Sequence, residues 1–182
     1  MCIRDRCSPH PDIPYMLVSE QENAGACLKW LRDTISRGKE TYKDLDKIAE
    51  TSVPGANNLT FLPWMYGERC PIEGHALRGG FLNLSLNHSF ADIIRSVLEG
   101  VAYHTNWMLF GFEKIIRENN GKIKEINFIG GGALSDIWSQ IYADITQKII
   151  NQISEPIHSG TKLSLIHISE PTRPLYISYA VF

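Results

Sequence analysis

The stretch KEINFIGGGALSDIWSQIYADI, residues 124–145, decides the fold of this chain. It begins with an apolar strand pattern, passes through the three glycines Gly130, Gly131 and Gly132, and continues with apolar residues at helical spacing. Those helical positions are Ile137, Trp138, Ile141, Ile145 and Ile149. Because glycine has no Cβ, the main chain at the triplet can adopt unusual dihedral angles and a ligand can approach it closely.

The helix that starts after the triplet is a second reason to expect a ligand. Ser135 or Asp136 could cap this helix, and its free N–H groups and positive dipole end would face back toward the turn. A strand, a glycine turn and a helix start together favour a nucleotide phosphate. A tight strand-to-helix connection often carries glycine without any ligand, however, so this stretch alone leaves the two interpretations balanced.

Length and composition are those of an ordinary globular domain. The 182 residues suffice for one domain with a sizeable core, and 43% hydrophobic and 21% charged residues are typical values. A net charge of −2 predicts neither nucleic acid nor an anionic membrane as a partner. The sequence shows no apolar run long enough for a membrane span and no signal segment, so we expect a cytoplasmic protein.

The cysteines and histidines predict no metal centre. Cys2, Cys7, Cys27 and Cys70 lack C-x-x-C spacing, which indicates a reducing compartment rather than a disulfide scaffold or a zinc site. The six histidines are dispersed along the chain.

The first third of the chain predicts a strand followed by two helices. Residues 15–18 are typical of a short strand, and Ser19 and Glu22 have capping-box spacing before a helix that ends near Gly38. A second, shorter helix is expected over residues 41–50, with Tyr42, Leu45, Ile48 and Ala49 facing inward.

The middle of the chain predicts further strands and one long helix. Residues 59–71 begin as a buried strand, and residues 75–86 are expected to alternate like a strand through Phe81, Leu84 and Leu86. Ser89 and Asp92 again have capping-box spacing, and apolar residues recur every three to four positions from there to about Asn119. This order of strands and helices predicts an α/β domain.

Several polar and glycine positions allow two interpretations. Glu68 and Arg69 emerge from an apolar run as either a structural ion pair or part of a cleft wall, and structure is favoured. Arg95 and Glu99 lie side by side on the long helix, in the less favourable order for an exposed pair. Gly25 lies near a helix start, where glycine is costly unless the helix packs closely or a ligand approaches its backbone.

The two ends of the chain do not read like its middle. Residues 1–6 and 163–182 resemble peptides translated from sequencing-adapter DNA, and we leave both out of the expected fold. A natural disordered tail is the alternative. The expected domain is residues 7–162.

Four blocks in order carry a resemblance to a known family. They read QENAGACLKWLRD (21–33), FLPWMYGERCP (61–71), LRGGFLNLSL followed by ADIIRSVLEGVA (77–102), and FIGGGALSDIWSQIYADI (128–145). Together they resemble the C-terminal domain of the FGGY carbohydrate kinases, and most of all xylulokinase-like members. Asn83 departs from the family pattern, because a glycine is usual at this position.

The resemblance implies the C-terminal lobe of an actin-like ATPase (ribonuclease H-like) fold, an α/β domain with a mixed sheet and flanking helices. ATP would bind between two lobes, and a sugar such as xylulose would accept its γ-phosphoryl group. Mg²⁺ would bind with ATP, mainly through the N-terminal lobe. That lobe would also hold the sugar and supply the aspartate that takes the hydroxyl proton, so we expect weak nucleotide binding and no turnover from this chain alone. Members of such families can form homodimers.

The resemblance also assigns nucleotide-binding residues. Gly131 and Gly132 of the triplet would lie against the phosphates and ribose, and Asp136 would take an adenine-side position that is often asparagine. Gly25 and Lys29 match helix positions that approach the nucleotide from the other wall, which favours close approach over packing at Gly25. Lys29 could equally be a solvated helix lysine.

Glu68 and Arg69 resemble the family's GER element near the interlobe cleft.

Three other interpretations compete with this one. A dinucleotide-binding oxidoreductase would require glycine at position 135, where this chain has Ser135. A P-loop kinase would require G-K-[ST] after the glycines, which is lacking. A non-catalytic actin-like regulatory or assembly domain stays open as the alternative.

Overall fold

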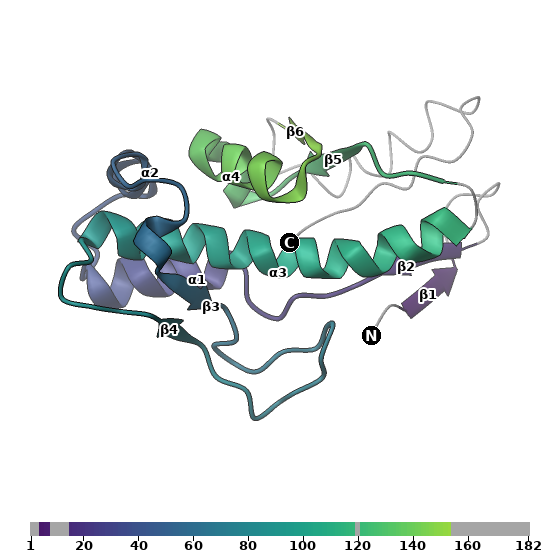
Figure 1. Ribbon diagram of the computed structural model, residues 1–182, viewed down its shortest axis with the longest axis horizontal. Helices are drawn as coiled ribbons and strands as arrows, with labels where there is room; N and C mark the ends of the chain where they lie inside the picture. The colour runs from purple at the N-terminus through teal and green to yellow at the C-terminus, as the bar shows by residue number, and fades with distance from the viewer. Residues whose placement is uncertain (1–3, 8–14, 119–120, 154–182) are drawn as a thin grey trace.

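The computed structural model describes residues 4–7, 15–118 and 121–153. The interpretation of residues 163–182 as a tail therefore falls outside the described residues, and so do residues 1–3. Arg4–Cys7 form strand β1, which pairs antiparallel with β2, Tyr15–Val18, as Figure 1 shows. The strand over residues 15–18 was predicted, whereas the domain boundary at residue 7 stays a prediction.

The long helix α3, Phe90–Glu118, runs through the middle of the molecule (Figure 1). Helices α1 (Gly25–Trp30), α2 (Tyr42–Glu50) and α4 (Asp136–Thr146) pack around its N-terminal half. The α3 side chains at this junction are Ile94, Val97, Leu98, Val101 and Ala102, all fully buried. Removing this apolar surface from water is the main driving force for the arrangement.

The N-terminus of α3 has the predicted capping box. The main-chain N–H of Ser89 donates to Asp92 Oδ2 at 2.8 Å, and the N–H of Asp92 donates to Ser89 Oγ at 3.2 Å. Asp92 Oδ1 accepts from Ser52 Oγ at 2.6 Å and from Asn57 Nδ2 at 2.8 Å. The hydrogen bond from Ser52, followed by those from Ser89, lowers the pKa of Asp92 to about 2.

The Asp92→Asn variant should therefore show a pH-dependent loss of stability. A depressed folded-state pKa contributes stability above the unfolded pKa of about 3.9, and that contribution is lost as the pH falls toward 2. At pH 6 we expect the free energy of unfolding of the variant to be about 1–2 kcal/mol lower than that of the parent, allowing for solvent screening. At pH 3 the difference should be smaller. Urea unfolding followed by circular dichroism at both pH values measures the difference. An equal loss at both would contradict a charge-assisted cap.

Gly100 lies where α3 packs directly on strand β3, Thr60–Leu62. A Cβ at this position would lie 2.4 Å from the carbonyl oxygen of Phe61. A glycine inside a helix costs about 0.5–1 kcal/mol relative to alanine, and here the close approach of the strand requires it.

The described strands form three two-stranded ladders that include both parallel and antiparallel pairs, within the predicted α/β class. β1 pairs with β2, and β3 pairs with β4 (Gly80–Leu82), both antiparallel. β5 (Glu125–Phe128) pairs parallel with β6 (Ile149–Gln152), and α4 connects them. Both strand directions are present, but α3 rather than a wide sheet supplies the surface on which the other helices pack.

Two sequence patterns predicted regular structure beyond the residue where the element ends. The alternation over 75–86 predicted a strand that continues through Leu84 and Leu86, but β4 ends at Leu82 and these side chains are 57% and 105% exposed. The chain turns at Asn83, whose φ of 63° lies in the left-handed region that favours glycine. This explains why a glycine would suit that position.

The second pattern is the helical spacing that was predicted to continue to Ile149, because the helix ends earlier. α4 ends at Thr146, and Gln147 follows in the left-handed conformation with φ 54°. Ile149 belongs to β6 and is 63% exposed. In α2, Tyr42 was expected inside but is 42% exposed, with the Arg32 guanidinium 4.4 Å from its ring centroid.

The predicted capping box of Ser19 and Glu22 does not form. α1 begins at Gly25, and Ala24 at its N-cap makes no side-chain hydrogen bond to the helix. The Ser19 hydroxyl instead donates to Cys70 Sγ at 2.8 Å. The helix continues as a π-helical turn, η1, over Leu31–Ile35, and closes near Gly38 as predicted.

Candidate functional site

The glycine turn connects β5 to α4. Gly130 has φ 95°, in the region that favours glycine, and Gly131–Leu134 form the 3-10 turn η3. Ser135 caps α4, because its Oγ accepts from the main-chain N–H of Trp138 at 3.2 Å. Of the two predicted caps, Ser135 has this role and Asp136 is the first residue of the helix.

The three glycines have different surroundings. A Cβ added to Gly130 or Gly131 would have no heavy atom within 4 Å, so the main chain there borders open space. A Cβ on Gly132 would lie 3.1 Å from Phe128 Cζ and 3.2 Å from the Trp138 ring. Gly130 and Gly131 thus offer bare main chain to a ligand, whereas Gly132 lets the turn lie flat on two aromatic rings.

Gln152 of β6 braces this turn. Its Nε2 donates to the carbonyl oxygen of Ala133 at 3.1 Å and to Asp136 Oδ1 at 3.0 Å. Asp136 is exposed and therefore lies at the mouth of the helix. Sequence reasoning missed Gln152, because the strand that carries it looked like a continuation of the preceding helix.

The rim of the turn carries negative charge from α2. Burial raises the pKa of Asp46, a hydrogen bond from Ser135 opposes the rise, and the charges of Glu50 and Asp136 add to it. An anionic ligand at this turn would therefore benefit from a cation that accompanies it.

The two site residues predicted on α1 are also open to solvent. Gly25 is the first residue of the helix, and a Cβ there would meet no heavy atom within 4 Å. Lys29 Nζ lies 2.5 Å from Asp33 Oδ2, and its side chain is 65% exposed. Within residues 15–118 and 121–153, no described hydrogen bond or ion pair connects Gly25 or Lys29 to the glycine turn. Contact between these residues and a nucleotide stays a prediction.

The neighbouring charges of Glu68 and Arg69 point apart. Glu68 is 2% exposed and makes no ion pair with Arg69. The Arg69 guanidinium lies outside, where it pairs with Glu20 Oε2 at 3.1 Å and with Glu22. The favoured structural ion pair therefore does not form between these two side chains, although the main-chain N–H of Arg69 donates to Glu68 Oε1.

The described residues contain neither a metal-binding cluster nor a membrane-spanning helix. No group of three histidine, cysteine, aspartate or glutamate residues in that part of the chain could hold a metal ion. None of its helices is both long and apolar enough to cross a bilayer.

Comparison with known proteins places this geometry in a family. The model of the FGGY family of carbohydrate kinases, C-terminal domain, matches residues 7–161. A xylulose kinase of Staphylococcus epidermidis is 38% identical over 122 residues, which are 67% of this chain and 24% of the relative. A gluconokinase of Bacillus licheniformis is 35% identical over 132 residues, covering 68% of this chain and 25% of the relative.

A solved structure has the same fold. The ligand-bound xylulose kinase from Lactobacillus acidophilus superposes with a TM-score of 0.76 and 31% identity, covering 90% of this chain and 32% of that one. This chain spans about a quarter of the length of the curated relatives it matches. The α/β arrangement around α3 and the family match lead to one conclusion: the chain belongs to the FGGY family of carbohydrate kinases, with the actin-like ATPase fold of their C-terminal domain.

Proposed function

We propose that this chain is the nucleotide-binding C-terminal lobe of an ATP-dependent sugar kinase that phosphorylates a ketopentose such as xylulose. The observation that carries the proposal is the open main chain at Gly130 and Gly131, beside the N-terminus of α4. The xylulose kinase relatives support the acceptor class.

The residues present fit a nucleotide. A methyl group at Gly130 or Gly131 would occupy the space that a phosphate or ribose needs to reach the main chain. The N–H groups at the start of α4 and its positive dipole end favour an anion in that space. In this proposal Asp136 takes the adenine side, and Gly25 and Lys29 take the opposite wall.

The chemistry would be transfer of a phosphoryl group to a sugar hydroxyl, with ATP as the donor and Mg²⁺ offsetting its charge. The role of this lobe is to bind and orient the nucleotide at the glycine turn. The carboxyl groups of Asp46 and Asp136 near the turn would disfavour an unaccompanied phosphate, which agrees with a nucleotide that arrives with its cation. The aspartate base and most Mg²⁺ and sugar contacts would come from the N-terminal lobe.

The Gly131→Val variant tests the nucleotide site. Gly131 does not have a positive φ, and an added side chain meets open space, so the free energy of unfolding should change by less than about 0.5 kcal/mol. The valine would occupy the ligand's space, and we expect the Kd for ADP to rise about tenfold or more. Isothermal titration calorimetry of the 182-residue chain with ADP and Mg²⁺ measures this.

Gly80→Val is the matched control. Gly80 lies on β4, and a Cβ there also meets nothing within 4 Å, so this variant should bind ADP like the parent. Parental affinity in Gly131→Val would reject the nucleotide assignment and favour a non-catalytic actin-like regulatory or assembly domain.

The gluconokinase relative favours a sugar acid as the second acceptor class. Comparing the rates at which the complete kinase phosphorylates xylulose and gluconate separates the two classes.

A further inference from the structure

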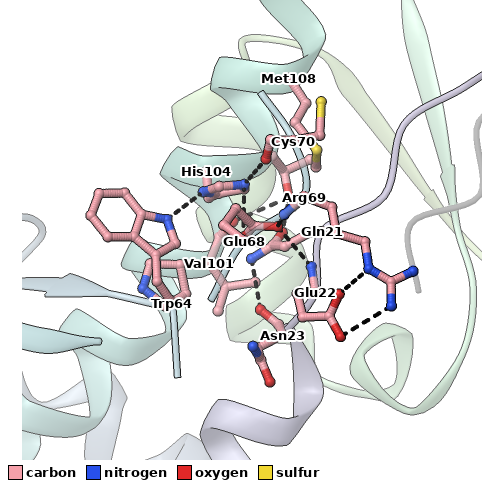
Figure 2. A network of polar contacts seen from close by, with 12 residues as sticks. Gln21, Glu22, Asn23, Trp64, Glu68, Arg69, Cys70, Val101, His104 and Met108 are labelled. Carbon is pink, nitrogen blue, oxygen red and sulfur yellow. Dashed lines mark hydrogen bonds and ion pairs between the residues drawn. The ribbon is translucent and has the colours of Figure 1, made fainter. Parts of the chain in front are cut away.

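Glu68 lies at the centre of a buried polar network that the proposed nucleotide site does not use (Figure 2). Its Oε1 accepts from the main-chain N–H of Glu22 at 2.9 Å and from that of Arg69 at 2.8 Å. Its Oε2 lies 3.3 Å from Nε2 of the buried His104 and accepts no hydrogen bond from the described residues. Burying a carboxylate this completely costs free energy unless hydrogen bonds or an opposite charge compensate for the lost water.

The partners of His104 fix its protonation state. The indole Nε1–H of Trp64 can only donate, and it lies 3.2 Å from His104 Nδ1, so Nδ1 carries no proton. The carbonyl oxygen of Cys70 can only accept, and it lies 2.7 Å from Nε2, so Nε2 carries the proton. His104 is therefore neutral. Burial lowers its pKa in agreement, against the opposing effects of Glu68 and the Cys70 bond.

The network holds the segment that leads into α1. α1 has no side-chain cap of its own, so contacts from elsewhere in the chain must fix where it starts. One such contact is the hydrogen bond from the main-chain N–H of Glu22 to Glu68. Another comes from α3, where the Thr105 hydroxyl donates to Gln21 Oε1 at 3.3 Å. The ion pairs of Arg69 with Glu20 and Glu22 lie at the surface, where such pairs contribute little. Glu68 and Thr105 are the buried members of this set, and Glu68 is the charged one.

We propose that Glu68 is a positioning residue: its carboxylate, packed beside neutral His104, holds Glu22 and thereby sets where Gly25 and the first turn of α1 lie. Its consequence for binding rests on the proposed function, because Gly25 and Lys29 are the α1 residues assigned to the nucleotide. A shift of Gly25 would move that wall of the site without any contact between Glu68 and the ligand.

Glu68→Gln tests the proposal. Glutamine keeps the shape and the Oε1 acceptor, but it can place an NH₂ group against the Nε2–H of His104. His104 cannot relieve this by moving its proton, because the Trp64 N–H already faces Nδ1. We expect shifted ¹H–¹⁵N signals for Glu22 and Gly25 and a rise of about fivefold in the Kd for ADP. Glu73→Gln, an exposed glutamate on the same loop, should change neither.

Glu68→Gln can fold and still contradict the proposal. Parental signals for Gly25 in this variant would show that Glu68 does not set the position of α1, and would overturn the proposal.

The parent chain provides an independent measurement. ¹⁵N NMR of the His104 ring should show Nε2 protonated and Nδ1 bare, and a proton on Nδ1 would overturn the proposal without any variant. If the parent bound no ADP, the proposed function would fail. The signals of Glu22, Gly25 and His104 would still decide whether Glu68 positions α1.

Discussion

Replacing Glu99 with alanine is expected to lower the free energy of unfolding by about 3–5 kcal/mol. Glu99 Oε1 accepts from Arg95 Nε at 2.7 Å and from the main-chain N–H of Gly55 at 2.9 Å. The two side chains are only 9% (Arg95) and 5% (Glu99) exposed, and Arg95 Nη1 also donates to the carbonyl oxygen of Ser52. Truncation would leave the guanidinium buried without its counter-charge. Urea unfolding of the 182-residue chain, followed by circular dichroism, measures the loss.

Two further variants show whether the charge or the packing matters. Removing both charges, as in Arg95→Met/Glu99→Leu, should restore at least half of the lost stability, because well-packed apolar pairs often replace buried ion pairs at little cost. Asp33→Ala breaks the exposed Lys29–Asp33 pair, which has the same order and spacing, and should cost less than about 1 kcal/mol. A double variant as unstable as Glu99→Ala would contradict the argument from uncompensated charge.

Local signals in the sequence predicted most of the helices. The spacing of Ser89 and Asp92 identified the start of α3, and Ser135 identified the start of α4, because each cap is completed within three residues. Ser19 and Glu22 have the same spacing, yet the prediction there was wrong. Their polar groups bond to Cys70 and Glu68, about fifty positions away, and a three-residue pattern carries no information about such competitors.

The candidate site could be predicted only in part for the same reason. The glycine triplet identified the turn, but three identical residues gave no hint that Gly132 packs on aromatic rings while Gly131 faces open space. Gln152 could not be found, because its strand pairs with β5 and follows α4 almost without a break in apolar spacing. His104 resembled any other polar residue of a long helix until Trp64 and Cys70 were placed beside it.

The Trp138→Ala variant is expected to lose about 3–5 kcal/mol of unfolding free energy, because it removes the largest side chain beneath the glycine turn. Trp138 is 4% exposed, its Nε1 donates to the carbonyl oxygen of Leu98 at 3.1 Å, and its ring lies edge-on to Phe128 with centroids 6.5 Å apart. Truncation would leave a cavity between α4 and α3, and it would remove part of the floor on which Gly132 lies. Urea unfolding followed by circular dichroism measures the loss.

Coupling to Gly132 makes this prediction specific. In the parent, Gly132→Ala should lower the free energy of unfolding by about 1 kcal/mol or more, because the new Cβ would press on the Trp138 and Phe128 rings. In the Trp138→Ala background one of these rings is gone, so the same substitution should cost less. Trp107→Ala removes a tryptophan that is 43% exposed on the outer face of α3 and should cost less than about 1 kcal/mol. If the two tryptophan variants were equally stable, or if Gly132→Ala cost the same in both backgrounds, the aromatic floor would not be what supports the turn.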